Sequence, residues 1–175
     1  MSDMKRRIAG RSPANLPIWS LSTGTTMSTT NTVTFHRLLR CPPQRLWRAF
    51  TTPEAFAKWL PPHGFYATVH KMDARVGGEW RMSFTNLTTG HGHSFGGRYL
   101  VLEPGRMLRY TAVFDDPNLP GEMTTTVHLE PVFCGTELRI EQSGIPAVIP
   151  APACVMGWQE SLALLAQLAE PEIPQ

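Results

Sequence analysis

Histidine has the widest chemical range of the residue types in this chain, since it binds metals and transfers protons near neutral pH. The chain has six histidines, and His91 and His93 stand two residues apart in a predicted hairpin, while His63 and His70 flank a predicted strand. No two of them have the helical His-x-x-x-His spacing that is typical of a zinc enzyme. Because His-Gly-His at a turn is more often solvated, we predict no metal site.

Carboxylates and a cysteine are the other candidates for catalysis. Asp115, Asp116 and Glu122 surround the segment Pro-Asn-Leu-Pro-Gly and could act as acids or bases at a pocket mouth. We favour a structural role in a surface turn, where Asp satisfies backbone donors. Cys154 lies just before the last predicted helix, whose dipole could lower a thiol pKa, but a buried inert thiol is more common. No phosphate-binding glycine loop or dinucleotide fingerprint is present, so we expect no cofactor.

A larger group of aromatic and sulfur-containing side chains could line a cavity for a small molecule. Pockets of this kind combine an apolar lining with few polar groups, and Met adapts its shape to its neighbours. The same residues could instead fill a core between a sheet and a helix, as aromatic side chains often do. The cavity candidates are Trp59, Phe65, Trp80, Met82, Phe84, Phe95, Tyr110, Phe114, Met156 and Trp158.

The elements that must position these residues begin where the hydrophobic pattern becomes regular. Residues 33–40 are typical of a strand, which Pro42 and Pro43 end. Two short helices are expected after these prolines, the second with Thr52 as its N-cap. Five or six strand-like stretches follow between residues 66 and 142.

The last element has a different period. Apolar residues recur at three- and four-residue steps from Val155 to Ala169, which is typical of a long amphipathic helix. In the preceding strands, apolar and polar residues alternate over residues 80–85, which indicates a sheet with one buried face. Such a sheet needs a cover, and this helix is the only predicted element long enough to provide it. The pattern therefore predicts an α+β chain.

Composition and charge restrict the class of partner. The net charge of +2 is too small to predict a nucleic-acid partner, and residues 1–30 contain four basic side chains against one acidic. No apolar stretch is long enough to span a membrane. The three cysteines form no C-x-x-C pair, which favours a cytoplasmic location. We predict a disordered extension over residues 1–31, one domain over 32–171 and a tail over 172–175.

Five segments of this domain stand in the order and spacing of a known superfamily. They are CPPQRLWRAFTTPE at 41–54, DARVGG at 73–78, GRYLVLEP at 97–104, GTELRI at 135–140 and GWQESL at 157–162. Together they resemble the SRPBCC (START/Bet v 1-like) superfamily, in the branch similar to the activator of Hsp90 ATPase homologue. Three more segments, WLPPHGF at 59–65, FDDPNLPGEM at 114–123 and GIPAVIP at 144–150, resemble bacterial members of unknown activity.

The resemblance covers roughly residues 32–170 and implies a helix-grip fold. In that fold, a curved antiparallel sheet of six or seven strands wraps around a long C-terminal helix, with two short helices after the first strand. The resemblance also implies a cavity between the sheet and the last helix, but it implies no single reaction, because one fold carries many functions.

Three functions stay open at this point. We favour a non-catalytic binder of a small hydrophobic or aromatic molecule, because no acid, base and nucleophile converge in the sequence. A polyketide cyclase or dehydratase is the first alternative, and it requires at least two inward polar side chains within mutual reach. A module that modulates a chaperone ATPase comes third, since the named relatives use an additional domain for that role. The sequence allows a homodimer without specifying one.

Overall fold

The computed structural model describes residues 26–27 and 31–174. Most of the segment predicted as a disordered extension, residues 1–31, lies outside these described residues. Within them, the chain forms eight strands and three helices. Among the described helices, none is long and apolar enough to cross a membrane.

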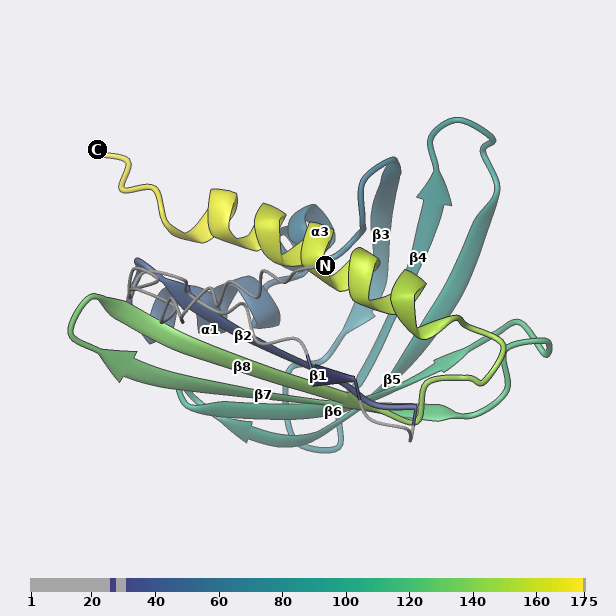
Figure 1. Ribbon diagram of the computed structural model, residues 1–175, viewed down its shortest axis with the longest axis horizontal. Helices are drawn as coiled ribbons and strands as arrows, with labels where there is room; N and C mark the ends of the chain where they lie inside the picture. Colours follow the sequence, from purple (N-terminus) through teal and green to yellow (C-terminus); the bar gives the residue numbers. More distant parts are fainter. Residues whose placement is uncertain (1–25, 28–30, 175) are drawn as a thin grey trace, which may run out of the picture.

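The strands form one antiparallel sheet, which curls so that one face is concave (Figure 1). Its spatial order is β1-β2-β8-β7-β6-β5-β4-β3, so β3 to β8 form a continuous meander and β2 pairs with the last strand. The seven strands longer than two residues agree with the predicted number. The strands are β1 (Thr26–Met27), β2 (Val33–Leu39), β3 (Phe65–Met72), β4 (Glu79–Asn86), β5 (Gly92–Glu103), β6 (Met107–Phe114), β7 (Glu122–Val132) and β8 (Gly135–Ser143).

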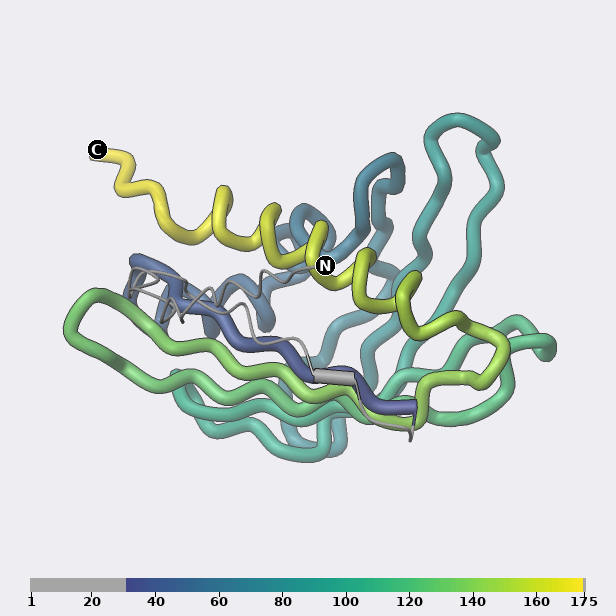
Figure 2. Tube along the Cα trace, in the orientation of Figure 1, coloured from purple at the N-terminus to yellow at the C-terminus, as the bar shows by residue number. Residues whose placement is uncertain are grey.

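Two of the helices connect β2, which is next to one edge of the sheet, with β3 at the other edge, and the third covers the concave face. α1 (Pro43–Thr51) and α2 (Pro53–Trp59) lead the chain from β2 to β3, which lies at the far edge (Figure 2). α3 (Ala151–Ala169) lies across the concave face (Figure 1). This arrangement confirms the predicted α+β helix-grip fold.

α3 begins four residues before Val155, the first apolar residue of the predicted stripe. Pro152 lies in its first turn, where an amide hydrogen would have no helical acceptor, so proline costs little there. Cys154 therefore lies inside the helix, and the prediction that it precedes the helix was wrong.

Side-chain alternation along the strands directs apolar residues to the concave face. In β7, Met123, Thr125, Val127 and Leu129 are buried while His128 is exposed. This is the period of two that a strand with one buried face requires. The residues opposite them on β8 repeat the pattern, with Ile140 and Leu138 also buried. The face that α3 covers is therefore apolar over most of its area.

An aromatic cluster attaches α1 and α2 to the sheet. The Trp59 ring lies 4.7 Å from that of Phe50 and 5.6 Å from that of Phe56, between ring centroids. The indole N–H of Trp59 donates a hydrogen bond to the carbonyl oxygen of Ala49 at 2.8 Å. The Phe56 ring in turn lies 6.1 Å from that of Trp80 on β4. These edge-to-face contacts pack one end of the concave face tightly.

Gly97 lies where β5 approaches β6 too closely for a side chain. A Cβ atom at this position would lie 2.0 Å from the carbonyl oxygen of Thr111. The indole N–H of Trp80, the residue paired with Gly97, donates to the same oxygen at 3.0 Å. The missing side chain at Gly97 thus allows the close approach to Thr111, and the hydrogen bond to this oxygen orients the Trp80 ring.

Replacement of Gly97 by alanine is expected to destabilise the fold. The added methyl group must displace the Thr111 backbone, and overpacking of this kind costs roughly 1–3 kcal/mol in free energy of unfolding. Gly157 in α3 is the control, because a Cβ there meets no atom within 4 Å. Gly157→Ala should raise stability by about 0.5–1 kcal/mol through helix propensity. Urea unfolding of both variants measures the difference, and equal stabilities would contradict this account of Gly97.

Candidate functional site

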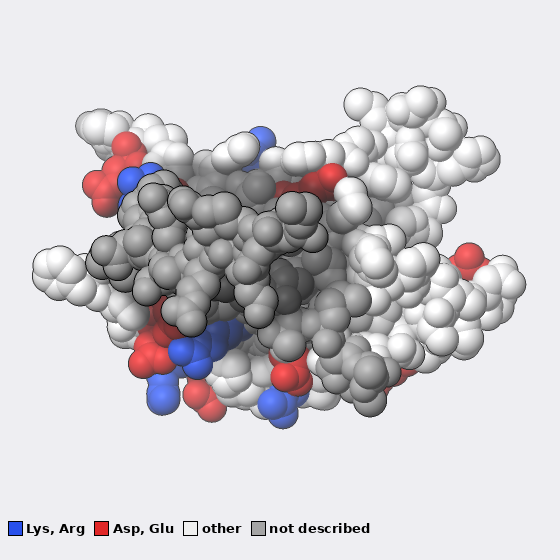
Figure 3. All heavy atoms as spheres, viewed as in Figure 1, with Lys and Arg blue, Asp and Glu red and all other residues white. Residues whose placement is uncertain are grey.

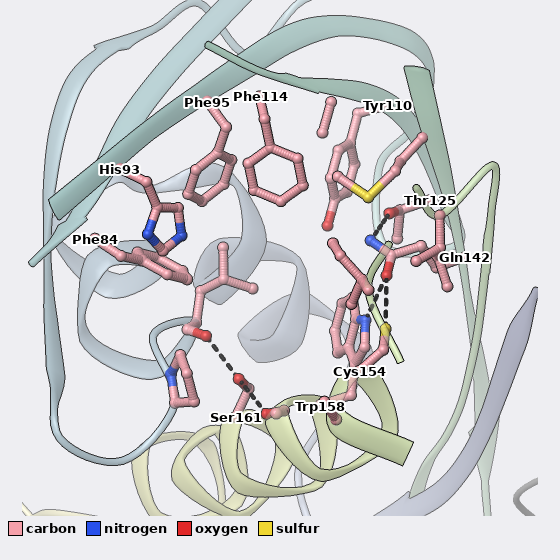
Figure 4. A pocket seen from close by; sticks show the side chains of 18 of the residues that line it. Phe84, His93, Phe95, Tyr110, Phe114, Thr125, Gln142, Cys154, Trp158 and Ser161 are labelled. Atoms are coloured by element: carbon pink, nitrogen blue, oxygen red, sulfur yellow. Dashed lines mark hydrogen bonds between the residues drawn. The ribbon is translucent and has the colours of Figure 1, made fainter. Parts of the chain in front are cut away.

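A pocket lies between the concave face of the sheet and the N-terminal half of α3 (Figure 4). Its volume is about 260 Å³. Residues of β4 to β8, of α3 and of the loops next to them form its walls. The lining residues are Leu60, Pro62, Trp80, Phe84, His93, Phe95, Tyr110, Ala112, Phe114, Met123, Thr125, Gln142, Ile145, Ile149, Ala153, Cys154, Gly157, Trp158 and Ser161.

The structure brings six of the ten predicted cavity residues together around this pocket. The other four lie elsewhere: Trp59 and Met82 are fully buried in the packed core, and Phe65 lies outside the lining, beside the ring of His93. Met156 is 62% exposed and faces away from the pocket. The six that line the pocket are Trp80, Phe84, Phe95, Tyr110, Phe114 and Trp158.

The helical period explains the position of Met156. The α3 residues in the lining are Ala153, Cys154, Gly157, Trp158 and Ser161. Their steps of three and four residues place them on one face of the helix, and residue 156 falls outside that stripe. Gly157 stands in the middle of the stripe, so the wall of α3 has no side chain at its centre.

A chain of hydrogen bonds on one wall joins α3 to the sheet. The carboxamide oxygen of Gln142 on β8 accepts hydrogen bonds from the Trp158 indole at 2.9 Å and from the Cys154 thiol at 3.6 Å. The Gln142 amide nitrogen donates to the hydroxyl of Thr125 at 3.2 Å. Thr125 also acts on Tyr110, because its side chain opposes in part the rise that burial causes in the pKa of Tyr110. Figure 4 shows these residues together at one side of the pocket.

Burial keeps the Cys154 thiol and the Tyr110 phenol in their neutral forms. It raises the pKa of the Cys154 thiol to about 11 and raises the pKa of Tyr110 well above its ordinary value. A thiol with such a pKa is almost entirely protonated at pH 7, and thiolate is the nucleophilic form. The structure therefore supports the inert-thiol interpretation of Cys154.

The other wall carries an imidazole among phenyl rings. The ring of His93 lies 5.7 Å from that of Phe84 and 5.9 Å from those of Phe95 and Phe114, between centroids. Burial lowers the pKa of His93, and the nearby carboxylate of Asp116 opposes this shift in part. The imidazole is therefore neutral at pH 7, with one ring nitrogen as donor and the other as acceptor.

The acidic candidates near the pocket have structural roles. Asp115 forms an ion pair with Arg81, and Asp116 accepts hydrogen bonds from the backbone and side-chain nitrogens of Asn118, both at 2.9 Å. This is the capped surface turn that we favoured from the sequence. Among the described residues, no group of three or more His, Cys, Asp or Glu side chains is placed to hold a metal ion.

Several lining residues were not among the predicted ones. Thr125 is in phase with Met123 and Val127 on β7, Gln142 with Ile140 on β8, and the period of two could have assigned them inward. His93 is likewise in phase with Phe95. Alternation alone, however, does not show which inward positions meet empty space.

The lowered pKa of His93 predicts how its titration links to folding. At pH values between the folded-state pKa and the ordinary pKa of 6.5, His93 is mostly protonated in the unfolded chain and mostly neutral in the folded chain. The contribution of neutral His93 to stability is therefore complete above pH 6.5 and decreases as pH falls toward the folded-state pKa. We expect an NMR titration of the His93 ring protons to give a midpoint below 6.5, and Asp116→Asn to lower it further. A midpoint at or above 6.5 would contradict the burial of this ring.

Comparisons with known proteins identify a family and several solved structures with a similar fold. Residues 40–170 match the family described as activator of Hsp90 ATPase homolog 1-like protein. The structure is similar to one of a protein from Chromobacterium violaceum, with a TM-score of 0.80 and 54% identity, covering 81% of this chain and 99% of that chain. A search of curated proteins found no match.

Two more solved structures are similar at lower identity. A Mesorhizobium loti protein is 30% identical, with a TM-score of 0.60 and coverage of 78% of this chain and 95% of that chain. A Rhodobacter sphaeroides protein is 26% identical, with a TM-score of 0.73 and coverage of 83% and 95%. From the family match and the shared fold, we conclude that the chain belongs to the activator of Hsp90 ATPase homolog 1-like family of the SRPBCC superfamily.

Proposed function

We propose that this protein binds a small hydrophobic or aromatic molecule, without catalysis, in the pocket under α3. The observation that carries the proposal is the lining itself, in which aromatic and aliphatic side chains surround a small set of neutral polar groups. Ligand sites in proteins have this composition.

The size of the pocket limits the ligand. An apolar cavity of about 150 Å³ is large enough to bind benzene. A pocket of about 260 Å³ therefore suits a molecule with one or two rings. Fused polycyclic ligands such as sterols would need a wider separation of α3 from the sheet.

The cyclase or dehydratase alternative requires polar side chains within mutual reach. Gln142, Thr125, Cys154 and Trp158 meet that condition, but they hydrogen-bond to one another and are all neutral at pH 7. Among the described lining residues there is no Asp, Glu, Lys or Arg. General acid–base catalysis needs a group that exchanges protons near the working pH. His93 is the described lining residue that can exchange protons near pH 7. No other described side chain hydrogen-bonds to it, so the pair of polar groups that an enzyme of this type requires is not formed around it. This favours a binder over an enzyme.

The cysteines support a cytoplasmic location as part of the proposal. Cys41 is buried, Cys154 is half-buried and Cys134 is exposed, and all three are free thiols. Free thiols persist in a reducing compartment.

Filling the pocket at Gly157 tests the proposed function. 2-Naphthol, a two-ring probe, should bind the full chain with a dissociation constant below about 1 mM, from roughly 0.4 kcal/mol per non-hydrogen atom. Gly157→Leu places a side chain in the empty centre of the α3 wall and should weaken binding about tenfold or more. Equilibrium dialysis measures both constants.

The matched control is Gln159→Leu, which adds a leucine at an exposed position two residues away on α3. It should change the affinity by less than about twofold, since surface substitutions away from a site have small effects. If 2-naphthol does not bind, or if Gly157→Leu binds it as well as the unmodified protein does, the pocket is not the binding site.

A further inference from the structure

One lining side chain differs from the others in its hydrogen bonds. The side-chain polar atoms of Ser161 and Trp80 donate to backbone carbonyl oxygens, those of Leu60 and Thr111 respectively. Gln142 and its partners satisfy one another on the facing wall. In contrast, no described residue forms a hydrogen bond with either ring nitrogen of His93, which also lines the pocket.

Aromatic rings surround the half-buried side chain of His93. Its ring stacks on Phe95 at an angle of 26° and has Phe65, Phe84 and Phe114 within 6.3 Å or less of its centroid. Burial of a polar group among hydrocarbons is unfavourable unless it is hydrogen-bonded. In Figure 4 the imidazole stands with Phe84, Phe95 and Phe114 on the wall opposite Gln142 and Trp158, with the pocket between them.

Among the described lining residues, none carries an Asp, Glu, Lys or Arg side chain that would compensate a charge on the ligand. Residues 82–97 and 142–159, which contribute most of the lining, contain no Asp, Glu, Lys or Arg. Figure 3 shows the projecting β4–β5 hairpin without charged side chains on the visible face. The charge that acts on His93 is the carboxylate of Asp116, which would repel an anion. A charged ligand would thus lose hydration without gaining an ion pair.

We propose that the pocket selects an uncharged one- or two-ring molecule that carries a hydroxyl group, and that His93 is the residue that hydrogen-bonds to this hydroxyl. This inference rests on the proposed function and specifies the chemistry of the ligand. A hydroxyl can donate to one imidazole nitrogen or accept from the other. A site built around such a bond rejects an analogue without the hydroxyl, because its own polar group is then left unpaired.

A matched pair of probes separates this bond from general hydrophobic binding. 2-Naphthol and 2-methylnaphthalene have nearly the same shape and differ by a hydroxyl in place of a methyl group. The ratio of their dissociation constants therefore reports the hydroxyl contact. 2-Naphthoate adds a negative charge to the same ring system and tests the selection for neutral ligands.

The experiment compares the three probes on the full chain and on two variants by equilibrium dialysis at pH 7.5. His93→Phe keeps a flat ring but removes both nitrogens, whereas His93→Gln keeps a donor and an acceptor. The preference for 2-naphthol over 2-methylnaphthalene should fall by about five- to tenfold in His93→Phe, which is the value of one hydrogen bond. His93→Gln should retain most of the preference, and 2-naphthoate should bind the unmodified protein about tenfold or more weakly than 2-naphthol.

The possible outcomes distinguish this inference from the proposed function. If both neutral probes bind but His93→Phe leaves their ratio unchanged, the role of His93 is overturned while the pocket stands. If 2-naphthoate binds as tightly as 2-naphthol, the selection for uncharged ligands is overturned. If no probe binds the unmodified protein, both the inference and the proposed function fail.

Discussion

The hydrogen bond from the Trp158 indole to the carboxamide oxygen of Gln142 holds α3 at a fixed distance from β8. Trp158 also packs against Phe35 on β2, with 5.8 Å between ring centroids. Further along the helix, Ser161 donates to the carbonyl oxygen of Leu60 at 2.6 Å and so ties α3 to the end of α2. These contacts lie near the middle of α3 (Ala151–Ala169) and fix the distance of the helix from the sheet at that point. The pocket beside the N-terminal half of α3 depends on this distance.

The two halves of α3 therefore have different tasks. Leu162, Leu165 and Ala169 are buried in the core, and apolar burial of this kind stabilises the fold by roughly 25 cal/mol per Å². The half that begins at Ala151 instead presents small residues and one indole to the pocket, with Gly157 at the centre. The C-terminal half of α3 therefore stabilises the fold by its buried side chains, while the N-terminal half is less tightly packed and leaves space for a ligand.

Much of the fold could be predicted because it follows from periodicity. Alternation along the strands and three- to four-residue steps in the last helix depend on which face is buried, and burial dominates the folding free energy. The start of α3 was missed because Ala151 and Pro152 carry no amphipathic signal, although proline suits a first helical turn. The five family segments added the order of the elements.

The site was only partly predictable, since a pocket is a place where packing is incomplete. Trp59 and Trp80 have the same sequence character, yet Trp59 is enclosed by Phe50 and Phe56 whereas Trp80 borders the empty space. Which inward residue meets a void depends on the distance between α3 and the sheet, and no local pattern encodes that distance. His91 and His93 were interpreted together as a solvated hairpin because His-Gly-His is common at turns, whereas in the structure His91 is exposed and His93 lines the pocket.

The most direct test of the central claim is a map of NMR chemical-shift changes on the full chain during titration with 2-naphthol. The account predicts saturable shifts at the side chains of Phe84, Phe114, Thr125 and Trp158, from both walls of the pocket and from α3. Shifts confined to the convex face of the sheet, for example around His128 and Arg139, would show that the probe binds elsewhere and would contradict the account.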